Sequence, residues 1–457
     1  MHDLTKGPIS SHLVRMAAPI AAGMIFQTLY YLVDLYFVAK IGGTAIAGVS
    51  AAGNVQFIIL ALTQVLGVGT MVLVSHAAGR KDQADANLIY NQSLVIAGIL
   101  AVVTAFFGFF LARSYLGTIA ADEGTLEAGM TYLRWFTPGM ALQFAMVAMG
   151  SALRGTGIAK PTMVVQMLTV LLNAALAPVL IAGIGTGRPM GVAGAGLASS
   201  ISVVAGVVMM FVYFERLEKY VHFDASLFRP RMDAWKRILR IGLPAGGEFA
   251  LMFIYMAVVY WSIRAFGAEA QAGFGLGGRV MQAIFLPAMA VAFAAAPVAG
   301  QNFGAGFHDR TRKTFTTSAG IGLALMSVLF VVCQLGAERM VQFFTPDATV
   351  ISIAAGFLHV ISWNFMASGL IFTCSGMFQA LGNTMPSVIS SATRMITFAI
   401  PAVWLSTRPG FQIRHIWFLS VATVMLQLVV SLLLLRREFR RRLGTSPAVM
   451  TPSPASA

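Results

Sequence analysis

Long apolar segments constrain the fold of this sequence more than any other feature. A helix needs about 20 apolar residues to cross a hydrocarbon core of roughly 30 Å, and the chain holds about twelve such segments. They are predicted at 14–39, 45–75, 87–112, 125–153, 161–183, 190–214, 238–264, 270–303, 314–337, 348–380, 386–406 and 411–435. Each is expected to be a helix, because a lone span in lipid must satisfy its own backbone hydrogen bonds. With 58% hydrophobic and 11% charged residues, the chain is predicted to be an all-α polytopic membrane protein.

The basic residues predict how the chain sits in the membrane. The net charge is +14, and an even number of spans puts both termini on one side. Most of the 31 Lys and Arg residues fall in the loops and tails of that side, which the positive-inside rule identifies as cytoplasmic. We therefore predict a multi-pass protein of the cell inner (plasma) membrane that attracts anionic lipids. The positive charge gives no reason to expect nucleic acid as a partner.

The sequence repeats itself at a fixed offset of 225 residues. Matching pairs include Arg15 with Arg240, Pro19 with Pro244, Gly157 with Gly382, and Pro161 with Pro386. The predicted domains are an N-terminal six-helix lobe (1–214), a cytoplasmic linker (215–237), a C-terminal six-helix lobe (238–436) and a disordered cytoplasmic tail (437–457). Two halves in the same orientation form a parallel repeat, which is common among alternating-access transporters.

Two acidic residues, Asp34 and Glu248, fall well inside predicted spans, where a charge costs roughly 2.5–3.5 kcal/mol on insertion scales. Gln27, Tyr30 and Asp34 are spaced i, i+3 and i+7, so they share one helix face. A carboxylate in a poorly solvated cavity takes up a proton more readily than one in water, and its ionised form attracts sodium or an organic cation. Competition for Asp34 would then give exchange. The alternative is a structural aspartate that caps a bend or pairs with a buried donor.

Several motifs resemble those of the multidrug and toxic compound extrusion (MATE) transporters of bacteria. They are the opening segment 3–9, the first span from Pro19 to Gly42, the paired segments 153–157 and 378–384, and the segment 300–306. The resemblance implies a two-lobed exporter with twelve helices. Such an exporter exchanges protons or sodium ions for organic cations and other amphiphiles. It also implies that Asp34 is the main coupling carboxylate and the place for a sodium ion.

The resemblance adds two residues to the predicted ion site. Asn173 matches the family's asparagine in the fifth helix, and Ser199 stands where some members have a threonine in the sixth. The aspartate often found after that asparagine is replaced by Ala177. One carboxylate fewer favours proton coupling over a full sodium site. Hydrogen bonding between helices is the structural alternative for Asn173 and Ser199.

Glu248 has two readings. Some sodium-coupled members carry a glutamate about one turn later, so Glu248 could serve as a second cation or proton site. Alternatively, it forms a structural ion pair with Arg279, which is predicted to lie at a similar depth. The predicted substrate cavity is lined by Gln27, Tyr30, Gln143, Tyr255, Arg279 and His359.

The sequence lacks the motifs of a phosphate-binding loop, a zinc hydrolase and a serine hydrolase. We therefore expect no enzyme activity and no cofactor apart from the coupling ion, with small amphiphilic or cationic substrates and a monomeric state. A lipid-linked saccharide flippase of a related superfamily is the alternative, if Arg134, Arg279 and Arg394 gather around one cavity. A polytopic membrane enzyme is a third class, although no catalytic constellation supports it.

Overall fold

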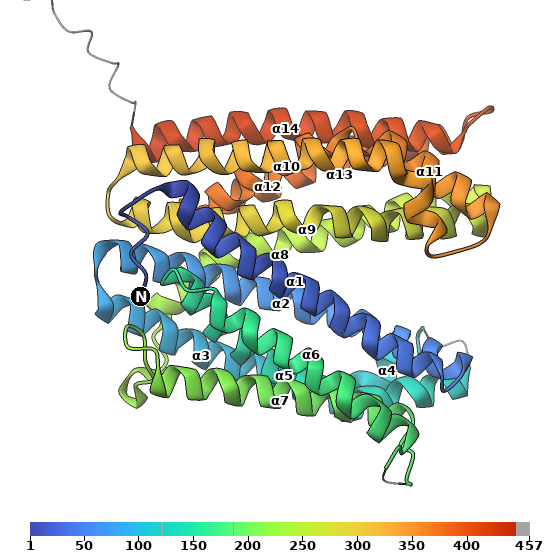
Figure 1. Cartoon of the computed structure of the whole chain (residues 1–457), viewed down its shortest axis with the longest axis horizontal. Coiled ribbons are helices and arrows are strands. Elements are labelled where there is room, and N and C mark those ends of the chain that lie inside the picture. The colour runs from blue at the N-terminus through green and yellow to red at the C-terminus, as the bar shows by residue number, and fades with distance from the viewer. Residues whose placement is uncertain (120–121, 186, 445–457) are drawn as a thin grey trace, which may run out of the picture.

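The computed structural model describes residues 1–119, 122–185 and 187–444. Within these ranges, the side chains of Tyr31, Asp34 and Leu35 lie outside the described part. The described chain is a bundle of long helices in two lobes. In Figure 1 the helices coloured light blue to green lie mostly below those coloured yellow to red, the dark-blue first helix runs diagonally from the upper left to the lower right, and both described ends of the chain lie on the left. We call this side the termini side.

The first lobe contains seven α-helices, of which two share one span. They are α1 (Ile9–Ala39), α2 (Gly43–Arg80), α3 (Gln83–Phe106), α4 (Ala112–Leu116), α5 (Glu123–Gly155), α6 (Lys160–Ala182) and α7 (Val192–Arg216). A π-helical turn, Phe107–Leu111, joins α3 to α4. Asp82 and Asp122 begin α3 and α5 by accepting backbone hydrogen bonds in the first turn, as short polar caps do.

The second lobe repeats this order. It contains α8 (Met232–Ile263), α9 (Ala268–Gly304), α10 (His308–Gln342), α11 (Ala348–Ile361), α12 (Asn364–Ala380), α13 (Met385–Ser406) and α14 (Ile413–Leu443). The repeat-related prolines Pro161 and Pro386 both stand in the first turn of a helix, α6 and α13, where proline's missing N–H costs no hydrogen bond. Among the described residues, eleven helices are long and apolar enough to cross a membrane, and a bent pair makes up to twelve. The predicted all-α, two-lobed fold is confirmed.

The tenth predicted span, 348–380, is wrong as a single helix. It breaks between α11 and α12 with a bend of 60°. Gln334 of α10 stabilises the break, because its Nε2 donates to the carbonyl of His359 at 3.0 Å and to Ser362 Oγ at 2.9 Å. Such bonds satisfy the backbone groups that a broken helix frees inside a membrane.

Two predicted domain limits also shift. The helix α8 begins at Met232, inside the segment predicted as linker, and Trp235 of its first turn donates to Gln92 of α3 at 2.8 Å. The helix α14 runs to Leu443, beyond the predicted limit at 436. Glu438 supports this extension by pairing with Arg441 and Arg442 at 3.4 and 3.1 Å, which is the spacing of neighbours on a helix. Residues 445–457 of the predicted tail lie outside the described residues.

The lobes approach each other closely at glycine residues. A methyl group at Gly242 of α8 would overlap the carbonyl oxygen of Val65 on α2, and one at Gly79 of α2 would overlap that of Gln301 on α9. Small residues allow helices in membranes to approach this closely. The Gly79 contact lies at the ends of α2 and α9 on the termini side (Figure 1), whereas the Gly242 contact lies further into the bundle along α2 and α8.

Side-chain hydrogen bonds complete this contact. His76 Nε2 donates to the carbonyl of Ala380 on α12 at 2.6 Å. Gln301 accepts from the backbone N–H of Leu4 at 3.0 Å and donates to the carbonyl of Gly155 at 3.0 Å. The motif 300–306 therefore holds the N-terminal segment and the end of α5 against the second lobe.

Candidate ion and substrate sites

The first lobe holds a buried pair of polar side chains at the predicted ion site. Asn173 of α6 donates from Nδ2 to Ser199 Oγ of α7 at 3.2 Å, and both residues are fully buried. The carbonyl oxygen of Asn173 accepts no hydrogen bond from the described residues. A buried neutral oxygen left without a donor is costly, and it is the kind of atom that completes a cation or proton site. The structure thus brings together two of the predicted site residues.

Asp34, the predicted main coupling residue, lies on α1, but its side chain is outside the described part. The backbone of α1 gives its register. Gly23 lies against the backbone of Met163 on α6, and Asp34 and Asn173 follow these two residues by eleven and ten positions. Both helices run away from the termini side (Figure 1), so the backbones of Asp34 and Asn173 lie at similar depth. Among the cavity residues predicted on α1, Gln27 is exposed and Tyr30 is half-buried.

Gln143, also predicted to line the cavity, lies on α5 in the first lobe. It accepts a hydrogen bond from Gln56 Nε2 of α2 at 2.9 Å. The Oε1 of Gln56 is buried and accepts no hydrogen bond from the described residues. Sequence reasoning missed Gln56, because the other side-chain amides of α2, Asn54 and Gln64, do not lie three or four residues from it and so do not mark a polar face.

In the second lobe, Glu248 of α8 faces hydroxyl groups. Its carboxylate accepts from Ser375 Oγ of α12 at 3.2 Å, and Ser391 of α13 also lies within hydrogen-bonding reach. Ser387 of α13 extends the group by donating to Ser375 at 3.1 Å. Within the described ranges Glu248 forms no ion pair, and Arg279 is exposed on α9. The alternative of a Glu248–Arg279 pair does not hold, because equal depth along two helices does not make their side chains face each other.

The other two predicted cavity residues lie at different places in the second lobe. His359 of α11 is bonded through Nδ1 to Gln334 Oε1 at 3.1 Å, so it belongs to the break between α11 and α12. Tyr255 of α8 is hydrogen-bonded to Ser420 Oγ of α14 at 2.9 Å. The guanidinium carbon of Arg394 lies 4.3 Å from the centroid of the Tyr255 ring. The sequence placed Arg394 in a span but gave it no partner.

The three arginines of the flippase alternative lie on three helices. Arg134 and Arg279 are exposed on α5 and α9, whereas Arg394 lies over Tyr255. Two of these side chains are thus exposed and the third stacks on an aromatic ring, which is not the convergence on one cavity that a pyrophosphate group would need.

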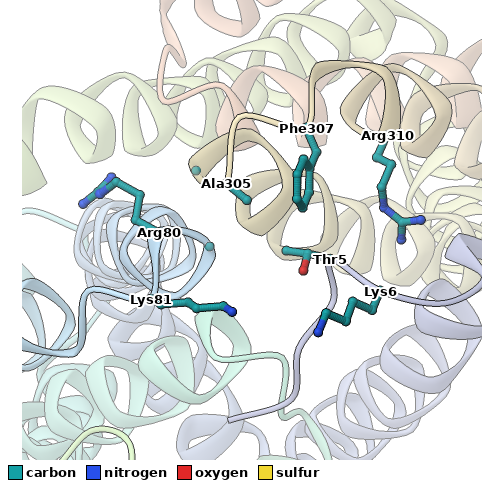
Figure 2. Close-up of a pocket in the computed structure, with 9 residues that line it drawn as sticks. Thr5, Lys6, Arg80, Lys81, Ala305, Phe307 and Arg310 are labelled. Atoms are coloured by element: carbon teal, nitrogen blue, oxygen red, sulfur yellow. The ribbon is translucent and has the colours of Figure 1, made fainter.

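A basic pocket of about 730 Å³ opens where the lobes meet on the termini side. Figure 2 shows Lys6 and Lys81 extending into it from two sides, with Arg80 and Arg310 at its flanks. Lys81 closes α2 in a left-handed conformation, with φ at 60°, which is uncommon for a residue with a side chain. The sequence assigned these residues to loops but did not predict that they would converge.

Comparison with known families identifies the chain. The MatE family model matches it twice, over residues 19–179 and 244–405. The chain belongs to the MatE family. The two matches begin 225 residues apart, which agrees with the internal repeat. The chain is therefore a MATE transporter with many transmembrane helices, and the resemblance seen in its motifs is confirmed.

Individual relatives share little sequence identity with the chain but match it over most of its length. The chain is 25% identical over 377 residues to the probable multidrug resistance protein YoeA of Bacillus subtilis, with 81% of each chain covered. It is 22% identical over 409 residues to an FAD transporter of Shewanella oneidensis, covering 89% of this chain and 90% of the other. Its fold matches the outward-facing structure of a multidrug resistance MATE family transporter of the MOP superfamily with a TM-score of 0.90. That match has 25% identity and covers 97% and 98% of the two chains.

Proposed function

We propose that this chain is a secondary active multidrug exporter, which antiports protons, or sodium ions, against organic cations and amphiphiles by alternating access. Family membership is the observation that carries this proposal, since both repeats match the MatE model. YoeA is named as a probable multidrug resistance protein, and export of amphiphilic drugs fits that name. The FAD transporter shows that a relative is named for a large substrate with phosphate groups, so substrate size and charge differ within the family.

Asp34 is the main coupling carboxylate in this proposal. It is one of two acids that the sequence places well inside spans, and its helix packs on α6, which carries Asn173. Asn173 supplies a carbonyl oxygen without a donor, and Ser199 supplies a hydroxyl. A proton or sodium ion bound there would remove the charge that attracts an organic cation, and release of the ion would restore it.

Proton coupling is the favoured form. Ala177, one turn after Asn173, is fully buried and supplies no second carboxylate. A sodium ion prefers several oxygen ligands with negative charge, whereas a proton needs one basic atom. Glu248 would act as a second proton or cation site in the other lobe, because its carboxylate lies among serine hydroxyls rather than beside a basic side chain.

The proposed setting is the cell inner membrane, with both termini cytoplasmic and the protein working as a monomer among membrane lipids. The basic pocket on the termini side supports this orientation, because cytoplasmic surfaces carry most of the Lys and Arg residues of membrane proteins. The closed contact between lobes then faces the cytoplasm, and substrate would leave from the opposite side.

The test is export by the purified chain in proteoliposomes, with proton and sodium gradients imposed separately. A proton gradient alone is expected to drive uphill export of a cationic rhodamine ester. Export driven only by sodium would overturn proton coupling but keep the antiporter. No gradient-driven movement of cationic amphiphiles would overturn the antiporter itself.

A further inference from the structure

The polar face of α13 continues beyond the Glu248 site. Ser387, Ser391, Arg394 and Phe398 follow the i, i+4, i+7, i+11 spacing of one helix face. The opposite face is apolar and exposed, with Ile389, Ile396 and Ile400 at 47%, 51% and 67% exposure. Arg394 therefore points into the second lobe rather than toward the lipid.

The partners of this face place Arg394 beside Tyr255 and outward of Glu248. On α8, Glu248 lies within hydrogen-bonding reach of Ser391. Two turns later on α8, the ring of Tyr255 lies 4.3 Å from the guanidinium carbon of Arg394. The ring centroid of Phe398 lies 4.8 Å from that of Tyr255. The hydroxyl of Tyr255 is bonded to Ser420, so its ring is fixed as a platform. The guanidinium thus stacks on an oriented aromatic ring near the middle of α13 (Met385–Ser406).

Arg394 lies inside a span, where an unpaired charge is costly, yet no acidic side chain of the described residues pairs with it. Across the described residues it forms no ion pair, and its Nε is buried without a hydrogen-bond acceptor. Basic residues inside membranes usually pair with acids or backbone carbonyls, or face a pathway for a charged substrate. A planar guanidinium on an aromatic ring is also suited to bidentate binding of a carboxylate or phosphate.

We propose that Arg394, held on Tyr255, binds an anionic group of the substrate, so that the exporter accepts zwitterionic amphiphiles in preference to purely cationic ones. This inference rests on the proposed export function and names its substrate class. The cationic end of such a substrate would face the carboxylate sites, while its carboxylate or phosphate would bind the free N–H groups of Arg394.

The test uses two forms of one dye. A rhodamine ethyl ester is cationic, and its free acid is a zwitterion of nearly the same shape. Binding to the purified chain is measured by fluorescence polarisation, and export is measured in proteoliposomes under a proton gradient. Loss of the charge-assisted hydrogen bonds in Arg394→Gln is expected to weaken binding of the free acid about tenfold and leave the ester unchanged, while Arg394→Lys retains part of the preference.

Arg408→Gln is the matched control. Arg408 follows the same helix at its outer end and also stacks on an aromatic ring, that of Trp404 at 4.5 Å, but it does not face the second lobe's polar site. This variant is expected to keep the preference for the free acid. Thermal unfolding of each variant in detergent reports folding independently of binding.

The outcomes separate the two proposals. Equal weakening of ester and acid by Arg394→Gln, or no effect on either, would overturn the role of Arg394 while wild-type export of the ester still supports the antiporter. Loss of ester export in Arg394→Gln would assign Arg394 to the transport cycle as a partner of Glu248 and would also overturn the inference. If the wild-type chain exports neither dye, the antiporter proposal fails, and the binding preference is then judged from polarisation alone.

Discussion

The two lobes share one helix order but place their helical irregularity in different spans. In the first lobe, the third span contains the π-helical turn Phe107–Leu111, whereas the fourth, α5, runs unbroken through Pro138. In the second lobe, α10 is a regular helix, whereas the fourth span breaks by 60°. The same fold therefore accommodates an irregular turn in either of two neighbouring helices.

The residues at the equivalent positions explain this difference. At the offset of 225, Pro138 corresponds to Trp363 at the break, and Phe109 of the π-helical turn corresponds to Gln334. A proline removes one hydrogen bond, yet α5 stays continuous. The break occurs instead where Gln334 donates to the groups that the bend frees. A neighbouring donor, rather than a proline, decides where a span breaks here.

The largest difference between the lobes is expected in ion coupling. Asp34→Asn removes the proposed main coupling charge, so it should abolish export against a gradient while substrate binding remains measurable. Glu248→Gln removes a carboxylate that accepts from hydroxyl groups and should only reduce the rate. Proteoliposome export under an imposed proton gradient measures both, with Asp309→Asn as the control, since Asp309 is 85% exposed at the start of α10. The opposite order of effects would move the coupling site to the second lobe.

The contact between the lobes gives the next largest effect. A methyl group at Gly242 would overlap the backbone of α2, and overpacking of this kind costs about 1–3 kcal/mol. Gly242→Ala should therefore lower the midpoint of thermal unfolding in detergent. The residue at the equivalent position of the first lobe is already Ala17.

Gly247→Ala is the control for this change. Gly247 lies one turn further along α8 and has open space around its Cβ position, so alanine there should stabilise the helix. If both variants shift the midpoint equally, backbone contact between the lobes is not what Gly242 provides.

The helix break predicts an effect of similar size, confined to the second lobe. Gln334→Leu removes two hydrogen bonds from Nε2 to the break and the Oε1 acceptor of His359 Nδ1, at a cost of about 1–3 kcal/mol. Its counterpart, Phe109→Leu, changes a side chain that is 48% exposed and should leave the unfolding midpoint almost unchanged. Hydrogen exchange measured by mass spectrometry should show faster exchange around Ser362 only in Gln334→Leu. Equal exchange in both variants would contradict the role assigned to Gln334.

Substitutions that remove one hydrogen bond of a serine hydroxyl should have the smallest effects on stability. Ser199→Ala removes the bond to Asn173, and Ser420→Ala removes the bond to Tyr255. Each should cost about 0.5–1.5 kcal/mol, the net value of a typical hydrogen bond, measured again as thermal unfolding in detergent. A much larger loss for Ser199→Ala than for Ser420→Ala would show that the first lobe's site also holds the helices together.

The sequence predicted the spans and the repeat, because apolar length and matching motifs are local properties of a chain. The family resemblance named Asn173 and Ser199, and the hydrogen bond between them matches the alternative of hydrogen bonding between helices. The sequence did not predict the break at Ser362, where neither glycine nor proline marks the bend and the stabilising donor lies on another helix. It left an ion pair between Glu248 and Arg279 open as one of two readings, since counting residues gives depth along a helix but not the direction of a side chain. The spacing of Ser387, Ser391 and Arg394 on one face of α13 was the available signal for the second lobe's site.

The glycine contacts between the lobes also bear on the gradient that the proposed antiporter would use. At Gly79 and Gly242 backbone meets backbone, and even a methyl group has no room. A chain of water molecules needs more room than a methyl group, and protons hop along such chains. Contacts this close are therefore expected to oppose proton leakage between the paired helices, which a proton-coupled exporter would need in addition to a coupling carboxylate.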